Sequence, residues 1–152
     1  MLADQVAAMI CGAVGAVVGT ALLQRRRRRL LDRADASGGV LEFPGAVLGS
    51  AGYCHPAGGM LRLDGTTLTW LTGKGGMSFP VPTDRLTVRA LADVRMSEAF
   101  PGDRNVAVVC DDAGTPVRIV VLAPDLHYRA RALPGLAALL PTPGEDGTTR
   151  RR

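Results

Sequence analysis

The sequence predicts a small, mainly β domain that follows one N-terminal transmembrane helix. Three observations lead to this prediction. Residues 6–23, VAAMICGAVGAVVGTALL, form one apolar run, and five arginines follow it almost at once. From residue 46 onward, apolar and polar residues alternate in short stretches, which is typical of strands. After Leu122, apolar residues recur at spacings of three and four, which is typical of an amphipathic helix.

The apolar run is long enough to cross a membrane, since its residues at about 1.5 Å each give roughly 27 Å of helix. Only MLADQ precedes it, without Lys or Arg. Positive charge stays on the cytoplasmic side of a span. We therefore expect a single-pass protein of the inner (plasma) membrane, with its N-terminus outside and its soluble domain in the cytoplasm. The residues that set this topology are Arg25, Arg26, Arg27, Arg28 and Arg29.

A cleaved signal peptide or a buried helix of a soluble protein would also contain an apolar run. A signal peptide carries its positive charge before the apolar stretch and a small-residue cleavage site after it, and this order is reversed here. A buried helix would show polar residues at helical spacing, and none occurs between Val6 and Thr20. Both comparisons favour the anchor.

Small residues recur every four positions along the expected membrane helix, so they share one face. Without side chains in the way, two helices approach closely in lipid. The pattern is consistent with pairing to a second copy or to another membrane protein, although glycine and alanine are also common throughout this chain. The residues of this face are Ala7, Cys11, Gly15 and Gly19.

The charge distribution argues against nucleic acid as a partner. The net charge is +4, but residues 34–149 hold nine basic and twelve acidic side chains, so the basicity lies in the arginine block and the tail. A nucleic-acid surface gathers Lys and Arg on a folded face, often with aromatics. The three cysteines are scattered and form no CxxC pair, which fits a reducing compartment and predicts neither a disulfide nor a metal site.

Composition divides the chain into four parts: an anchor over residues 1–24, an arginine-rich juxtamembrane linker over 25–44, a β domain with a C-terminal helix over 45–140, and a disordered tail over 141–152. The linker should be helical at first and break at Ser37-Gly38-Gly39. Seven strands are predicted, each bounded by turn residues: Ala46–Tyr53, Met60–Asp64, Thr67–Thr72, Met77–Val81, Leu86–Leu91, Asn105–Cys110 and Val117–Leu122.

Three local features refine these predictions. Asp64-Gly65 is a strong hairpin signal. The sixth and seventh strands are nearly all apolar, as in strands that are covered on both faces or that close a barrel. Pro124 suits a first helical turn, the apolar repeat continues to Leu140, and Pro134-Gly135 should kink or split the helix.

Seven short strands followed by a helix are the element order of a pleckstrin-homology-like (PH-like) barrel, in which the helix caps one end. The stretch GMLRLDGTTLTWLTGKGGMSFPVPTDRLTVRAL resembles the middle of bacterial PH-like and GRAM-like domains. The layout is also similar to a family of uncharacterised actinobacterial single-pass membrane proteins with an arginine run and an "L-x-W" strand, matched here by Leu68-Thr69-Trp70. The resemblance implies a PH-like seven-stranded barrel or sandwich with a C-terminal cap, and no activity.

PH-like domains that bind phosphoinositides cluster Lys and Arg in the loop between the first two strands. The corresponding segment here, YCHPAGG, has none, which argues against inositol-phosphate recognition. Protein or peptide binding on the barrel surface remains open, including strand addition at a sheet edge.

No residue constellation predicts a reaction, a cofactor or a bound metal. Cys54-His55 are neighbours without a third orienting group, so we interpret them as loop residues. We expect His127 at the helix surface, Asp111-Asp112 in a hairpin turn, and Trp70 in the core. Gly73-Lys74-Gly75-Gly76 lacks the flanking pattern of a phosphate loop. Three arginines of the predicted strand region could share one barrel face, although solvated strand residues explain them as well: Arg62, Arg85 and Arg89.

We therefore expect a non-catalytic, membrane-tethered adaptor, scaffold or accessory protein that presents a cytoplasmic PH-like domain to protein partners. The alternative is a peripheral sensor of anionic lipid headgroups, acting through the arginine block and a barrel face. An enzyme with an unrecognised site is a third, weaker alternative.

Overall fold

The computed structural model describes residues 20–73, 76–100 and 104–140. Its contacts divide the chain into two compact units, one ending at Gly39 and the other beginning at Val40. In the first unit, residues 20–36 are helical. Gly38, at φ +69°, and the hydrogen bond from Gly39 N–H to the Ala34 carbonyl end this helix in a Schellman turn. The predicted break at Ser37-Gly38-Gly39 is confirmed.

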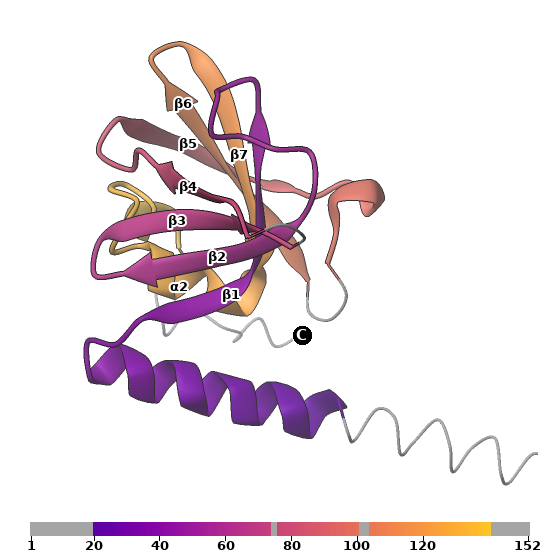
Figure 1. Cartoon of the computed structure of the whole chain (residues 1–152), viewed down its shortest axis with the longest axis vertical. Helices are drawn as coiled ribbons and strands as arrows, with labels where there is room; N and C mark the ends of the chain where they lie inside the picture. The colour runs from indigo at the N-terminus through magenta and orange to yellow at the C-terminus, as the bar shows by residue number, and fades with distance from the viewer. Residues whose placement is uncertain (1–19, 74–75, 101–103, 141–152) are drawn as a thin grey trace, which may run out of the picture. The chain divides into compact units, whose positions relative to one another are not determined.

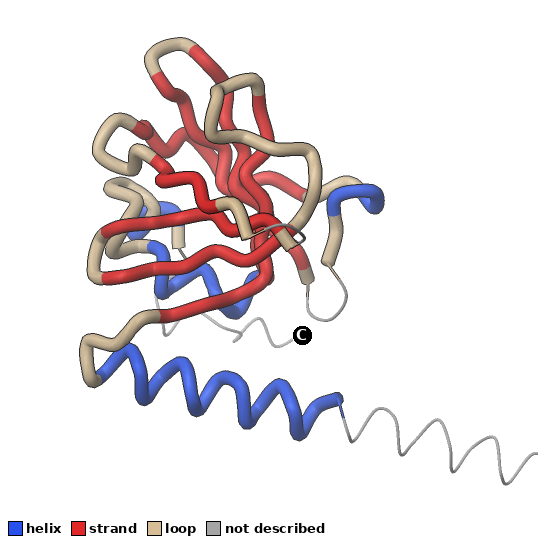
Figure 2. The backbone as a smooth tube through the Cα atoms, viewed as in Figure 1, coloured by secondary structure: helices blue, strands red, loops and turns tan. Residues whose placement is uncertain are grey.

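The second unit contains one antiparallel sheet of seven strands in the order β4-β3-β2-β1-β7-β6-β5 (Figures 1 and 2). The mainly β class and the seven strands are therefore confirmed. The strands are β1 (Leu41–Gly49), β2 (Gly59–Asp64), β3 (Thr67–Thr72), β4 (Ser78–Val81), β5 (Leu86–Asp93), β6 (Asn105–Asp112) and β7 (Thr115–Leu122).

Strand β1 begins at Leu41, so the prediction that the first strand runs from Ala46 to Tyr53 is wrong. Leu41–Gly45 pairs with β2, and Gly45–Gly49 pairs with β7. Gly45 is the residue at which the partner changes, and a Cβ there would collide with the Leu61 side chain. Pro44 and Gly45 resemble strand breakers in the sequence, yet they lie inside the strand at this change of partner.

The main core lies on one face of the sheet. In β2 and β3, buried and exposed residues alternate, with Leu61, Leu63, Leu68 and Trp70 almost fully buried. The expectation that Trp70 is a core residue is confirmed. The predicted hairpin at Asp64-Gly65 is also confirmed, because Gly65 has φ +58°.

A smaller apolar cluster lies on the opposite face, so β6 and β7 have buried residues on both sides, which is one of the two alternatives predicted for them. Ala46, Ala107 and Val120 from β1, β6 and β7 are buried there. We call residues 94–100 the strap. It contains the 3₁₀ helix η1 (Met96–Glu98), and its residues Val94 and Phe100 pack against this cluster.

The C-terminal helix is much shorter than predicted. The segment after β7 contains the 3₁₀ helix η2 (Ala123–Asp125), the four-residue helix α2 (Leu126–Arg129) and the 3₁₀ helix η3 (Ala137–Leu139). Gly135 has φ +88°, which an α-helix cannot accommodate. Leu133 and Leu136 are nevertheless fully buried. The apolar spacing is thus satisfied by successive short turns. The predicted split at Pro134-Gly135 is confirmed, whereas the prediction that a helix runs from Pro124 up to this split is wrong, because α2 ends at Arg129.

Candidate functional site

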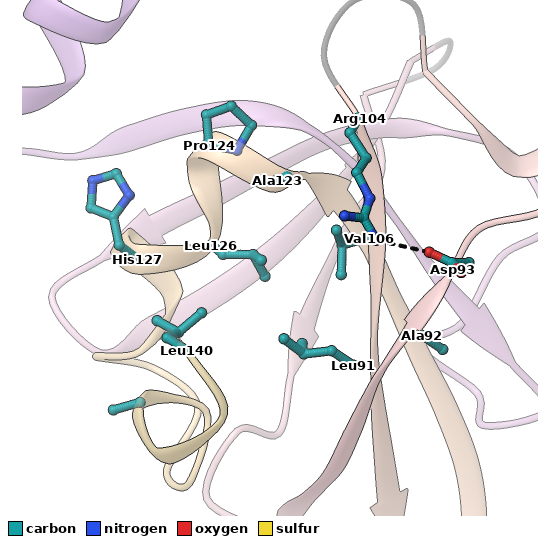
Figure 3. A pocket seen from close by; sticks show the side chains of 11 residues that line it. Leu91, Ala92, Asp93, Arg104, Val106, Ala123, Pro124, Leu126, His127 and Leu140 are labelled. Carbon is teal, nitrogen blue, oxygen red and sulfur yellow. Dashed lines mark hydrogen bonds and ion pairs between the residues drawn. The ribbon is translucent and has the colours of Figure 1, made fainter. Parts of the chain in front are cut away.

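An apolar groove of about 990 Å³ lies between strand β5 and the C-terminal segment (Figure 3). Leu91 and Ala92 form its β5 wall, and Val106 of β6 lies beside them. Leu126 and Leu140 form part of the opposite wall (Figure 3). The complete lining is Leu91, Ala92, Asp93, Arg104, Val106, Ala123, Pro124, Leu126, His127, Ala137 and Leu140.

Local sequence explains why the two walls face one another. Strand β7 ends at Leu122, and Pro124 turns the chain into η2. The Ala123 N–H donates to the Arg104 carbonyl over 2.7 Å, which fastens this turn beside the start of β6. Apolar side chains from residues that are far apart in sequence then meet across the groove.

The polar side chains of the groove are at its mouth. Asp93 Oδ1 and Arg104 Nη2 lie 3.0 Å apart, and both side chains are largely exposed, at 89% and 75%. An ion pair so open to water contributes little stability. His127 is exposed, as predicted, and its ring lies 3.8 Å from the Tyr128 ring centre. The lining thus combines an apolar interior with a solvent-exposed ion pair at the rim. This combination suits the binding of a partner with an apolar surface.

Strand β5 also presents an open edge beside the groove. It pairs with β6 and is one end of the described sheet. The other end is β4, which has four residues and contains Pro80, a residue without a backbone N–H. Among the described strands, β5 is therefore the edge better able to accept another strand.

The adjacent Cys54 and His55 do not form a nucleophile and base. The His55 ring stacks on Trp70 at 5.3 Å, and its Nδ1 accepts the Ala57 N–H over 3.2 Å. Burial raises the pKa of the Cys54 thiol, with a further contribution from nearby Asp112, so the thiolate is disfavoured. Both residues hold the β1–β2 loop in place.

A polar cluster joins the same loop to the end of β6. Asp112 is nearly buried and accepts a hydrogen bond from the Tyr53 hydroxyl over 2.8 Å. Arg85 Nη2 lies 3.0 Å from the same Asp112 oxygen. Burial and the bond to Asp112 raise the pKa of Tyr53 well above its usual range. This cluster fixes the loop to the sheet, and the sequence does not predict it.

The three arginines considered as a shared basic face do not assemble into one. Arg85 and Arg89 lie near the end of β6, each within 4 Å of a carboxylate, Asp112 and Asp111 respectively. Arg62 lies on β2 opposite Thr69 of β3, in another part of the sheet. The hypothesis of a common face is wrong, and the paired carboxylates offset the charge of the first two.

Of the two residues predicted in this hairpin turn, Asp111 has a turn role, whereas Asp112 is nearly buried at the end of β6 and belongs to the polar cluster with Tyr53 and Arg85. The Asp111 side chain accepts the Gly114 N–H over 3.1 Å, while Ala113 and Gly114 have positive φ values of 50° and 91°. Within the described ranges, no group of three His, Cys, Asp or Glu side chains could hold a metal ion.

Some predicted residues lie outside what the structure describes. They include the residues of the expected pairing face, Ala7, Cys11, Gly15 and Gly19. They also include two residues of the glycine-rich loop, Lys74 and Gly75. The arginines 25–29 belong to the helix over residues 20–36. Over the described parts of the chain, no helix combines the length and apolarity that crossing a bilayer requires.

Comparison with known proteins adds no family to these observations. No protein-family profile, no curated protein and no solved structure matches the chain significantly.

Proposed function

We propose that this chain is a non-catalytic adaptor, scaffold or accessory protein held in the inner membrane by one helix, with its β domain in the cytoplasm. The apolar run followed by five arginines supports the anchor and its orientation. Tethering confines the domain to the membrane surface and raises its effective concentration for other membrane proteins. A second copy could pair through the small-residue face of the anchor.

The observation that carries the adaptor function is the groove beside β5. Its interior is apolar, and its two charged side chains pair with each other at the mouth. No lining residue is a nucleophile placed against a base, so the arrangement supports binding more than catalysis.

We also propose that the β domain is PH-like. Strands that are consecutive in the chain pair with one another, β2-β3-β4 on one side of β1 and β7-β6-β5 on the other, and β1 divides its length between β2 and β7. The segment after β7 contributes buried leucines to the core, as a terminal cap would. The short α2 departs from the single long helix of that layout.

Site-specific crosslinking in native membranes tests the adaptor proposal. A photoreactive residue at Ala137, which is exposed and lines the groove, should join the full chain to a defined membrane protein. The same group at Thr67, which is exposed on β3, is the matched control. Equal crosslinking from both positions, or none from either, would contradict the proposal.

The lipid-sensing alternative makes a different prediction. If a face of the β domain recognises anionic lipid, the separate unit from Val40 onward should bind anionic vesicles, and added salt should release it. The carboxylates paired with Arg85 and Arg89 argue against this. We therefore expect no such binding.

A further inference from the structure

We infer that the β domain pairs with a second copy of this chain through the side of β2, β3 and β4 that faces away from the core. We call this side the outer face, and its side chains alternate with the core residues: Met60, Arg62, Asp64, Thr67, Thr69, Leu71 and Ser78. A hollow of about 580 Å³ lies on the outer face. The inference rests on the proposed membrane tether and adds a contact between two tethered domains.

The charged side chains of the outer face have no ion pair within the described part of their own chain. Arg62 and Asp64 stand two residues apart on β2, and neither has a carboxylate or a base within 4 Å among the described residues. Glu42 of β1 stands opposite Arg62 in the register, without an ion pair to it. Four other arginines of the β domain each have a carboxylate partner: Arg85, Arg89, Arg104 and Arg118. The outer face therefore offers a base and an acid, at a fixed spacing, to a partner.

A second copy matches both charges, because the outer face is complementary to itself. A two-fold axis between two such faces, perpendicular to β2 at the level of Leu63, places Arg62 of each copy opposite Asp64 of the other. The neighbours of these two charged residues on β3 are Thr69 and Thr67, respectively. The same axis therefore places Thr69 opposite Thr67 of the other copy. Two ion pairs and two hydroxyl contacts form by symmetry.

The size of the outer face indicates that pairing depends on the membrane tether. Three strands about 4.8 Å apart and six residues long cover on the order of 300 Å². A stable interface buries roughly 800 Å² on each partner. Met60 is 36% exposed and adds apolar surface, but the contact stays small. Two domains on one membrane overcome this limit, since tethering raises their effective concentration.

Charge reversal tests the pairing. Arg62→Asp gives a face with two acids and Asp64→Arg a face with two bases, so each variant should associate with itself about tenfold more weakly than wild type. A mixture of the two variants should regain the association of wild type, because an acid then meets a base at both positions. Full chains fused to donor and acceptor fluorescent proteins, in phosphatidylcholine vesicles, report association as energy transfer. Arg95→Asp, the same change at an exposed residue of the strap, is the matched control and should change nothing.

The membrane helices need a separate control, because they can also pair through their small residues. Replacing Gly15 and Gly19 by Leu removes that contact from every chain in the experiment. The mixture of the two charge variants should still associate better than either variant alone. Thermal unfolding establishes that each variant is folded.

No energy transfer for wild type, or equal transfer for wild type and both charge variants, would overturn the inference. A mixture that associates no better than its components would do the same. A photoreactive residue at Thr67 should join two copies and no other protein, so it remains a control for the groove. A product of Thr67 with a different protein would assign the outer face to that partner and contradict the pairing. The adaptor function fails separately, if Ala137 joins no other protein while the mixture still associates.

Discussion

The guanidinium carbon of Arg129 lies 3.9 Å from the centre of the Phe43 ring. Arg129 belongs to α2 and Phe43 to β1, and both side chains are fully buried. Arg129 Nη1 also donates to the Asp125 carbonyl over 3.1 Å. This contact fastens the C-terminal segment to the first strand, so it supports one wall of the groove.

Replacing Arg129 by Met should lower the free energy of unfolding by about 3 kcal/mol, since a buried cation–π contact and a hydrogen bond are lost together. Urea unfolding of the full chain in detergent measures this change. Phe43→Leu keeps an apolar side chain but removes the ring face. The double variant should therefore be less destabilised than the sum of the two single changes. Strict additivity would show that the two side chains do not interact.

Asn105 holds the strap through two hydrogen bonds to Phe100. Its Oδ1 accepts the Phe100 N–H over 2.8 Å, and its Nδ2 donates to the Phe100 carbonyl over 2.9 Å. Asn105→Asp keeps an acceptor and loses the donor, so it should cost about 1–2 kcal/mol. Amide hydrogen exchange at Phe100 should accelerate in this variant, while exchange in β2 and β3 stays unchanged. An unaltered rate at Phe100 would mean that Asn105 does not hold the strap.

Gly59 should tolerate no side chain. A Cβ there would collide with the backbone carbonyl oxygen of Leu71, which cannot move without distorting β3. We expect Gly59→Ala to cost at least about 2 kcal/mol by chemical unfolding. Gly52→Ala is the matched control, because a Cβ at Gly52 meets no atom within 4 Å, and it should change stability by less than about 0.5 kcal/mol. Similar effects of the two changes would contradict the close packing of β2 on β3.

Burial raises the pKa of the Cys110 thiol to about 11. The unfolded chain therefore loses this proton at a lower pH than the folded chain. The resulting stabilisation is fully present below the ordinary thiol pKa and is lost as pH rises toward 11. Between pH 8 and 11, wild type should lose roughly 2–3 kcal/mol more than Cys110→Ala. Parallel losses in urea titrations of the two proteins would refute the raised pKa.

Local chemistry explains which parts of the fold could be predicted. Thr67–Thr72 is a strand with the predicted bounds because its alternation and its flanking turn agree. The start of β1 is hard to predict because Pro44 and Gly45 resemble breakers, although Leu41 and Phe43 alternate into the core. The length of the C-terminal helix is easily overestimated, because short turns can bury the same apolar spacing as one helix.

The groove could be predicted only in part. The sequence leaves binding by strand addition at a sheet edge open, but it does not show which strand provides that edge. Leu91 and Leu126 line the same groove only because β6 and β7 pair beside β5 and bring the segment that follows β7 close to it. The strap and the cluster of Tyr53, Arg85 and Asp112 depend equally on contacts between residues distant in sequence.

Membrane topology is the claim on which the proposed function depends most. Alkaline phosphatase, which is active only outside the cytoplasm, and a green fluorescent protein, which fluoresces inside it, can each be fused after residue 140. The account predicts a fluorescent cell and an inactive phosphatase, and replacing the five arginines by Gln should weaken this orientation. An active phosphatase with a dark fluorescent fusion would place the β domain outside the cytoplasm and contradict the account.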